Sequence, residues 1–576
     1  MSISRKGHVQ ELTSATLVEP EVDGSAGASG RPSFRSEKTA VEDAGPVPDS
    51  PRSFEEKDQR DARPPMIFVP PKNDNRCLIL CFDGTGDSFD ADNSNIVNFV
   101  SALKKDERSK QMVYYQSGIG TYGGKMSSPA ANKISLTLDA MIAWNLDLHV
   151  MAGYEFLMQN YTANDRICMF GFSRGAYIAR SLAGMIHKVG LLPVDNHQQV
   201  PFAYRMYTRA DAVGWAQSNA FKKAFSNDVH IDFIGVWDTV DSVGLIPRRL
   251  PFTTSNTIVR TFRHAVSLDE HRTKFKANLW NLPNEQEKDM GISHTVPATP
   301  APNPNPNRRT PKFRATLPFA KPHFKTSNES DEDVEQTKYE TYFVQRQHHK
   351  TRPTDVLEVW FAGCHCDVGG GSVPNDTRNS LARIPLRWMI RECFKADTGI
   401  LFDAIRLQEL GLDPATLYPF VLPRPPPLPV EKKQTLPKPQ GWLRRLLSGK
   451  KIKDEFTMAA ELEDKPLEKP RPGMEEEEEL KDALSPVYDQ LHLNPVWWIL
   501  EFIPFTFRYQ HEGQWVTEFG ANFGRARKIP HQHPPQKAQA NHKPPANLHI
   551  HRSVKMRKAA GYLNRARFYS DPIWVD

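Results

Sequence analysis

The chain has 576 residues, with 74 Lys and Arg against 68 Asp and Glu, and 6 cysteines. The near-balanced charge and the lack of a basic stripe with interleaved aromatic residues argue against a nucleic-acid-binding protein. Six cysteines in so long a chain do not form a disulfide framework. The N-terminus has no apolar core of a secretory signal, and no run of about 18 apolar residues could span a bilayer. We therefore expect an intracellular, cytoplasmic protein.

Composition divides the chain into four blocks. Residues 1–70 are rich in Ser, Gly, Pro and charge, which predicts a disordered tail. Residues 74–422 have the pattern of a catalytic domain, with a disordered insertion at about 291–335. Residues 423–479 are Pro-rich, then Lys-rich, then acidic, and indicate a linker or excursion. We expect residues 480–576 to pack on the catalytic domain or to complete it.

Short apolar strands alternate with helical patterns through the catalytic block. The predicted strands are 77–82, 112–116, 167–170, 231–236 and 356–361, and the predicted helices are 96–103, 134–158, 204–225, 263–270 and 384–393. Strands that are apolar on both faces are typical of a parallel sheet covered by helices on each side. The sequence therefore predicts an α/β fold with a mostly parallel sheet and helices on both faces.

A G-x-S-x-G motif lies between the strand at 167–170 and the helix that follows it. Its residues are Gly171, Phe172, Ser173, Arg174 and Gly175. In a nucleophile elbow the serine sits on a strained strand-to-helix turn, and bulk two residues before or after it would clash with neighbouring backbone. The motif alone is a common string, and a surface loop with chance glycines is the plainer interpretation. Its place between a strand and a helix favours a nucleophilic Ser173.

Two further strand ends supply candidate partners for the serine. Asp238 follows the strand at 231–236, and His365 follows the strand at 356–361. The carboxyl ends of parallel strands meet at one edge of a sheet, so these side chains are expected to converge. The chain order Ser173, Asp238, His365 is that of α/β-hydrolase triads. As plainer alternatives, His365 is a lone loop histidine and Asp238 caps the next helix.

Other residues near His365 leave alternatives open. Asp367 is a rival for the role of orienting carboxylate, or it holds the Gly-rich turn that follows. Cys364 and Cys366 flank the histidine and raise the possibility of zinc. Ligands at this spacing do not match the usual C-x2–4-C pattern, and the sequence contains no second cluster. We therefore expect no metal and no organic cofactor.

The first strand ends in a Gly-rich turn with polar residues, Asp83, Gly84, Thr85 and Gly86. The turn lacks the Gly-Lys-Ser/Thr ending of a phosphate-binding P-loop. In a serine hydrolase its backbone N–H groups would suit an oxyanion hole, together with the N–H of Arg174. The Arg174 side chain could contact an anionic substrate group, or form a salt bridge on its own helix.

Five segments in chain order carry a family resemblance: FDGTGD, GFSRGAY, VWDTVDSVG, RHAVSLDEHRTKF and WFAGCHCDVGGG. Together they resemble the DUF2235 family, the Tle1-like catalytic domain of type VI secretion phospholipase effectors, in its fungal form. The resemblance spans about residues 74–395. It implies an α/β-hydrolase fold, ester hydrolysis, phospholipase activity as in bacterial relatives, and a triad at Ser173, Asp238 and His365. The family often has a serine where this chain has Cys366, which leaves His365 and Asp367 unaltered in type.

The sequence thus predicts a serine hydrolase of carboxylic esters, with a lipid-like substrate. The rival is an interaction protein with a weak or inactive hydrolase scaffold, whose Pro-rich and acidic segments recruit partners. The apolar tract Val496–Phe507 could contact a membrane interface or form a lid. An apolar tract with helical spacing is more often buried, so we expect it in the core.

Overall fold

In the part of the chain that the structure describes, eight strands form one sheet, in the order β10-β9-β6-β5-β4-β3-β1-β2, and every neighbouring pair is parallel. The strands are β1 (Cys77–Phe82), β2 (Gln111–Gln116), β3 (Arg166–Phe172), β4 (Ile231–Trp237), β5 (Val259–Ser267), β6 (Asp355–Phe361), β9 (His549–His551) and β10 (Ile573–Val575). The predicted α/β class is confirmed, and so are the five predicted strands.

The computed structural model describes part of the chain, all of it within the unit Arg63–Asp576. The described residues are 75–118 without 85, 86 and 88; 146–240; 250–281; 336, 339 and 340; 354–436 without 432, 433 and 435; 474–529 without 495, 512 and 513; 548–568; and 571–576. The predicted tail, the predicted insertion at about 291–335 and the first part of the predicted helix 134–158 lie outside these residues.

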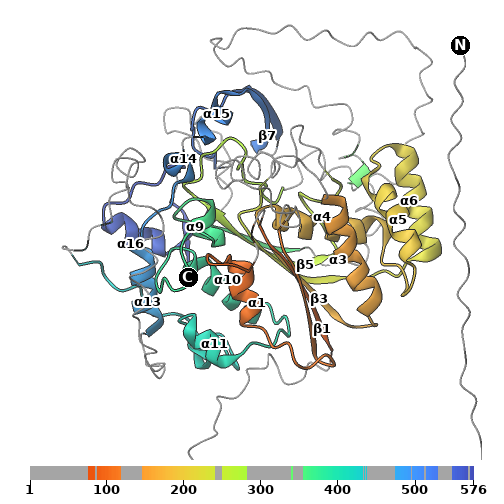
Figure 1. Ribbon diagram of the computed structural model, residues 1–576, viewed down its shortest axis with the longest axis horizontal. Helices are drawn as coiled ribbons and strands as arrows, with labels where there is room; N and C mark the ends of the chain where they lie inside the picture. The colour runs from red at the N-terminus through yellow and green to blue at the C-terminus, as the bar shows by residue number, and fades with distance from the viewer. Residues whose placement is uncertain are drawn as a thin grey trace, which may run out of the picture. The chain divides into compact units, whose positions relative to one another are not determined.

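Helices cover both faces of the sheet, as the alternation in β1 requires (Figure 1). Leu78, Leu80 and Phe82 belong to a core with α3 (Leu146–Asn160), α4 (Arg174–Val189), α5 (Val200–Thr208) and α6 (Ala212–Phe225). Cys77, Ile79 and Cys81 belong to a second core with α1 (Asn95–Ser101), α10 (Arg383–Lys395) and α11 (Ala404–Glu409). Successive side chains of a strand point to opposite faces, so one apolar strand supplies both cores.

The predicted helix at 263–270 is wrong, because most of this segment is strand β5 at the centre of the sheet. The polar residues of this segment are buried and paired. Arg263 contacts Glu392 and Asp355, each at 2.6 Å, and the His264 ring lies 2.8 Å from Glu358. Buried charges of this kind are retained when a partner is supplied from elsewhere in the chain.

The acidic end of the predicted linker 423–479 is also corrected. Residues Met474–Ala483 form α13, and the carboxylates of Glu475, Glu479 and Asp482 are buried. Arginines from distant segments neutralise them. Glu479 is 2.9 Å from Arg424 and 2.5 Å from Arg552, Glu475 accepts from Arg391 at 3.0 Å, and Asp482 is 2.7 Å from Arg387. The acidic run is therefore part of the packed structure.

The apolar tract Val496–Phe507 does not lie in the core as expected. It forms α15 (Trp497–Phe502) and the first part of the hairpin β7 (Phe505–His511) and β8 (Gln514–Gly520), after α14 (Gln490–Leu493). Ile499 is 63% exposed and Phe502 60%, whereas Glu501 is fully buried. The short helix turns its acid inward and its apolar side chains outward. Among the described residues, no helix combines the length and apolarity needed to cross a bilayer.

We predict that Glu479→Gln lowers the free energy of unfolding by about 2 kcal/mol at neutral pH, since it removes the nearest carboxylate from two buried arginines and leaves them only longer ion pairs with Glu475 and Glu476. Burial raises the pKa of Glu479, but Arg424, His551 and Arg552 lower it to about 2, against an ordinary value of 4.5. The contribution of Glu479 is thus present above about pH 4.5 and is lost as the pH falls toward 2.

Denaturant unfolding of both proteins as a function of pH tests this, with the less buried Glu477→Gln on the same helix as control. A difference between wild type and Glu479→Gln that does not shrink in acid would contradict the electrostatic explanation.

Candidate active site

Ser173 lies between β3 and α4 in a strained conformation, with φ 57° and ψ −120°. A non-glycine residue at positive φ is uncommon and is often found at functional sites. The two motif glycines have the packing role that the sequence predicts. A Cβ on Gly171 would clash with the backbone of Gly175 and Ala176, and one on Gly175 with the carbonyl oxygens of Phe82 and Asp83. The turn is thus closely packed against the end of β1.

Asp238 and His365 extend from the same sheet edge toward this serine. Asp238 follows β4, which neighbours β3, and His365 opens the short helix α9 (His365–Gly369) after β6. His365 Nε2 lies 2.8 Å from Ser173 Oγ, and His365 Nδ1 lies 2.5 Å from Asp238 Oδ2. With the proton on Nδ1, the ring donates to the carboxylate and accepts from the serine hydroxyl. The structure thus brings the three predicted residues into one chain of hydrogen bonds.

Burial and charge set the protonation of this chain. Burial by itself would raise the pKa of Asp238. Arg527 and His365 lower the pKa by more than burial raises it, so it lies well below the ordinary value. Burial lowers the pKa of His365, and the hydrogen bond that its ring donates to Asp238 only partly opposes this. A neutral imidazole beside an ionised carboxylate can accept the serine proton at neutral pH.

The segment after β5 encloses the imidazole. Glu270 accepts the backbone N–H of His365 at 3.2 Å and pairs with Arg272 at 2.8 Å. The Phe275 ring meets the imidazole edge-on at 4.9 Å, and the Phe172 ring lies 4.7 Å from it on a tilted plane. These contacts fix the histidine rotamer. The sequence motif at 263–275 indicates the family, but it does not indicate that Glu270 and Phe275 enclose the imidazole.

Arg527 is a site residue that sequence reasoning missed. Its Nη1 donates to Asp238 Oδ1 at 2.5 Å and its Nη2 donates to Asp238 Oδ2 at 2.9 Å. It follows β8 in a segment that reads GRARK, where nothing distinguishes it from the neighbouring cations. Only the three-dimensional fold reveals that Arg527, of the three cations in this segment, reaches the buried carboxylate.

Asp367 does not reach the imidazole in this arrangement. Its carboxylate accepts the backbone N–H groups of Cys364 at 2.8 Å and Tyr488 at 3.1 Å. Burial raises its pKa to about 7, against these two hydrogen bonds. Asp367 therefore holds the turn, which was one of its two predicted roles. Within the described ranges, no three His, Cys, Asp or Glu side chains are arranged to hold a metal ion.

The Gly-rich turn after β1 is described only in part, because Thr85 and Gly86 lie outside the described residues. The N–H of Gly84 donates to the carboxylate of Asp83 at 2.8 Å, so here it is engaged within the turn. Arg174 is the first residue of α4, where backbone N–H groups have no acceptor within the helix. Burial lowers the pKa of its side chain to about 10, against the attraction of Asp87, so the guanidinium stays charged at neutral pH.

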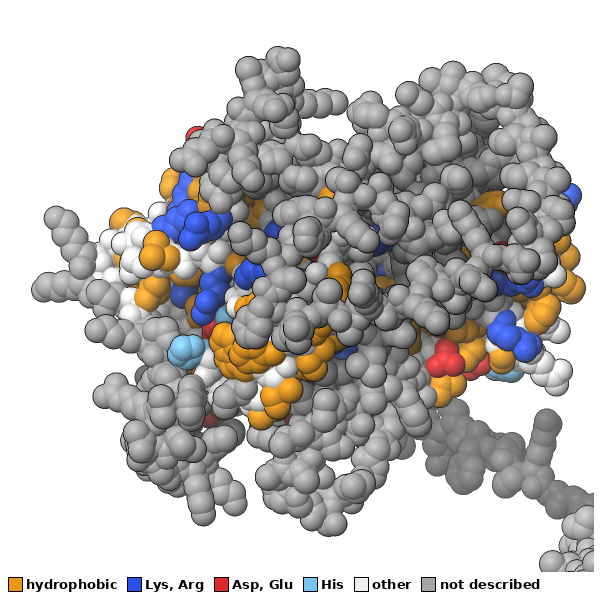
Figure 2. Space-filling model, turned by 90° about the horizontal axis from the view of Figure 1, so that it is seen from above, with side chains coloured by type: hydrophobic (Ala, Val, Ile, Leu, Met, Phe, Trp, Pro, Cys, Tyr) orange, Lys and Arg blue, Asp and Glu red, His pale blue; other side chains and the backbone are white. Residues whose placement is uncertain are grey.

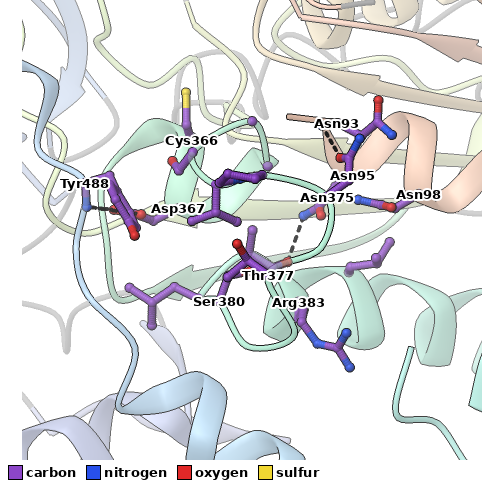
Figure 3. Close-up of a pocket in the computed structure, with 18 of the residues that line it drawn as sticks. Asn93, Asn95, Asn98, Cys366, Asp367, Asn375, Thr377, Ser380, Arg383 and Tyr488 are labelled. Atoms are coloured by element: carbon purple, nitrogen blue, oxygen red, sulfur yellow. Dashed lines mark hydrogen bonds between the residues drawn. The ribbon is translucent and has the colours of Figure 1, made fainter. Parts of the chain in front are cut away.

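A pocket of about 90 Å³ adjoins the histidine turn (Figure 3). Cys366, Asp367, Asn95 and Arg383 are among its lining residues, whereas Ser173 and His365 are not. In Figure 3 the backbone N–H of Tyr488 points at Asp367 from the C-terminal segment. The pocket therefore lies behind the candidate site and does not offer a place for the reacting ester.

Comparison with known proteins places the chain in a family. A protein of Saccharomyces cerevisiae, itself uncharacterized, is 30% identical over 533 residues, which cover 79% of this chain and 76% of that protein. A solved structure of an uncharacterized Pseudomonas aeruginosa protein has a TM-score of 0.28 at 15% identity, and covers 57% of this chain and 46% of the other. The Tle1 effector bound to the VgrG spike of the type 6 secretion system has a TM-score of 0.24 at 15% identity, with 53% and 52% covered.

The chain therefore spans about half the length of each of these two structures, and both TM-scores are too low to argue a shared fold from them. The model of the Tle1-like catalytic domain of type VI secretion phospholipase effectors matches residues 76–392, which contain all of the residues predicted for the site. The chain belongs to this Tle1-like phospholipase effector family.

Proposed function

We propose that the protein is a serine hydrolase that cleaves carboxylic esters of lipid-like molecules through an acyl-enzyme. The observation that carries this proposal is the hydrogen-bonded chain from Ser173 Oγ through the His365 imidazole to Asp238. Ser173 Oγ bonds to the ester carbonyl carbon while its proton passes to His365 Nε2. The C–O bond to the alcohol then breaks, and His365 returns the proton to the leaving oxygen. Water repeats the sequence on the acyl-enzyme and releases the acid.

In this proposal backbone N–H groups stabilise the oxyanion. The N–H of Arg174, which directly follows the nucleophile, is one donor at the positive end of α4. The turn Gly84–Gly86 is the proposed source of the second donor. Because Gly84 donates to Asp83 in this structure, that donor would come from Thr85 or Gly86, or from Gly84 after a rearrangement. The charged Arg174 side chain is suited to an anionic headgroup near the ester.

We predict that a serine-reactive fluorophosphonate labels the wild-type protein, and that Ser173→Ala abolishes both labelling and ester turnover. The loss of turnover should be at least about 10,000-fold, as expected when a nucleophile is removed from a triad. A native wild-type protein that is neither labelled nor active on a panel of phospholipids and acyl esters would favour the rival, an inactive hydrolase scaffold.

The two carboxylates near His365 can be told apart by matched variants. We predict that Asp238→Asn lowers kcat on a short-chain ester by about 10,000-fold, because an amide cannot hold the correct tautomer of the histidine. Asp367→Asn should keep most of the turnover and lower the thermal midpoint instead, because its carboxylate accepts two backbone N–H groups. Turnover that is lost only in Asp367→Asn would contradict the assignment of Asp238.

We further propose peripheral contact with a lipid surface through α15 and the end of β8. Trp498, Ile499, Phe502, Phe519 and Phe523 are between 39% and 63% exposed. The rings of Trp498 and Phe502 lie 6.1 Å apart, and those of Phe502 and Phe523 5.7 Å apart, so these three side chains form one apolar cluster. Figure 2 looks down on this end of the molecule and shows apolar side chains gathered beside Lys and Arg. Exposed apolar clusters commonly mark interaction sites.

Position and charge favour a lipid over a protein partner. Trp497 of α15 packs on Phe275 at 5.4 Å, and Phe275 packs on His365, so the cluster adjoins the reacting groups. Arg525 is exposed on the segment that follows β8, and its charge suits a negatively charged membrane surface. Trp498 donates its indole N–H to Leu491 and keeps its apolar part outward, as interfacial tryptophans do.

We predict that Phe502→Asp weakens binding to vesicles of phosphatidylcholine and phosphatidylserine at least about tenfold, since it places a charge in the apolar cluster. Cosedimentation in a Ser173→Ala background separates binding from hydrolysis. Phe225→Asp is the matched control, because Phe225 is 58% exposed but lies at the end of α6. Equal loss in both variants, or no binding by the parent, would contradict a lipid-binding surface here.

A further inference from the structure

Arg527 lies outside the segment that matches the family's catalytic domain, yet it contacts the carboxylate at the centre of the candidate triad. The match ends at residue 392, whereas Arg527 follows strand β8. Only 2% of its side chain is exposed, and the Asp238 side chain has no exposed surface. An arginine this deeply buried against a triad carboxylate needs an explanation beyond surface charge.

The guanidinium is held in one orientation from both sides. Its two terminal nitrogens donate to the two oxygens of Asp238, at 2.5 and 2.9 Å. Its Nε donates to the carbonyl of Phe275 at 2.9 Å, and Nη1 donates also to the carbonyl of Ser267 at 3.2 Å. A planar fork with donors on two edges fixes the plane of the carboxylate, which a lysine ammonium cannot do.

The carboxylate needs such a partner. A buried carboxylate with insufficient counter-charge becomes protonated, because burial disfavours the charged form. Protonated Asp238 would stabilise the imidazolium of His365 poorly and could rotate away from Nδ1. The remaining donors to Asp238 are the His365 ring itself and the backbone N–H of Ser267, at 2.8 Å. Arg527 supplies the only full positive charge bonded to Asp238 among the described side chains.

We propose that Arg527 is a positioning residue for the reaction: its guanidinium keeps Asp238 ionised and fixed in the rotamer that aims His365 at Ser173. This inference rests on the proposed function. The simpler alternative is that Arg527 has a structural role only and holds the C-terminal segment against the catalytic domain. An anchor would affect stability, with no effect on the proton affinity of His365.

The charged and titratable groups around the pair come from several elements. Asp238 follows β4, Glu270 and Arg272 follow β5, and Arg527 follows β8. Glu270 favours the imidazolium of His365, while Arg272 disfavours it, and each stays in place in an Arg527 variant. His264, which also lies beside Asp238, donates to Glu358, and burial lowers its pKa. Removing Arg527 thus takes one cation from the site, and the coupled pair of Asp238 and His365 takes up a proton at higher pH.

The test compares Arg527→Met and Arg527→Lys in the full chain by the pH dependence of kcat/KM on a short-chain ester. We predict that Arg527→Met lowers kcat/KM at least about tenfold, within the loss known for triad carboxylates. The acidic limb of its pH profile should move to higher pH, because without the Arg527 charge the Asp238–His365 pair takes up a proton more readily. Arg527→Lys keeps the positive charge but loses the planar pair of donors. The acidic limb of its pH profile should therefore stay near that of the wild type, while its kcat/KM falls. Arg567→Met, which changes an exposed arginine of the same C-terminal region, is the matched control.

Two further measurements separate this inference from the proposed function. In an Asp238→Asn background, Arg527→Met should change the rate by less than about twofold, because its partner has been removed. NMR titration of the His365 ring follows proton uptake by the Asp238–His365 pair without any turnover, and its midpoint should show the same upward shift in Arg527→Met. An unchanged ring pKa in a folded Arg527→Met protein would overturn the inference, even if the wild type is an active esterase. A shifted ring pKa in a protein without turnover would uphold the positioning and refute the proposed function.

Discussion

A fully buried carboxylate, that of Asp238, is the constraint on which the candidate site depends. A charge in that position is stable only where hydrogen bonds and counter-charge replace lost water. The replacements come from three places: the imidazole of His365 after β6, the backbone N–H of Ser267 at the end of β5, and the guanidinium of Arg527 after β8. Because β4, β5 and β6 are neighbours in a parallel sheet, folding the sheet delivers the first two together. The third requires the C-terminal segment to be in place as well.

The same sheet holds the serine in a conformation that a free chain would avoid. A residue in such a backbone region costs on the order of 1–3 kcal/mol and persists only when its surroundings over-determine it. Here β3 and α4 are buried on both sides of Ser173, and the flanking glycines let β1 approach closely. The strain turns the hydroxyl toward His365. Sheet and elbow therefore act together: packing stabilises the turn, and the turn presents the oxygen to the base.

Local patterns in the sequence predict the parts of this arrangement that depend on local physics. Continuous apolar runs identify the buried strands, and glycines two residues from Ser173 identify the turn. The predictions that are wrong or incomplete share a different cause. The polar residues of β5, the acidic run of α13 and Arg527 look exposed in the sequence, because each is neutralised by a partner far away in the chain. The paired residues are 73 to 289 positions apart, which leaves no periodic signal, so composition alone assigns such residues to solvent. The prediction for α15 is wrong in the opposite sense: its apolar side chains were expected in the core, but Ile499 and Phe502 are exposed.

The C-terminal region accordingly contributes to the fold and the site in ways that a family match over residues 76–392 does not reveal. β9 and β10 extend the sheet beyond β6, and Glu479 of α13 binds both Arg424 and Arg552. A chain ending near residue 392 would retain the candidate nucleophile, base and carboxylate, but would lose the cation that balances the carboxylate. Burial would then favour protonated Asp238, whose hydrogen bond no longer stabilises an imidazolium. The motif residues alone therefore do not define the reactive unit. That unit is the motif residues together with the counter-charge that keeps them in the right protonation state.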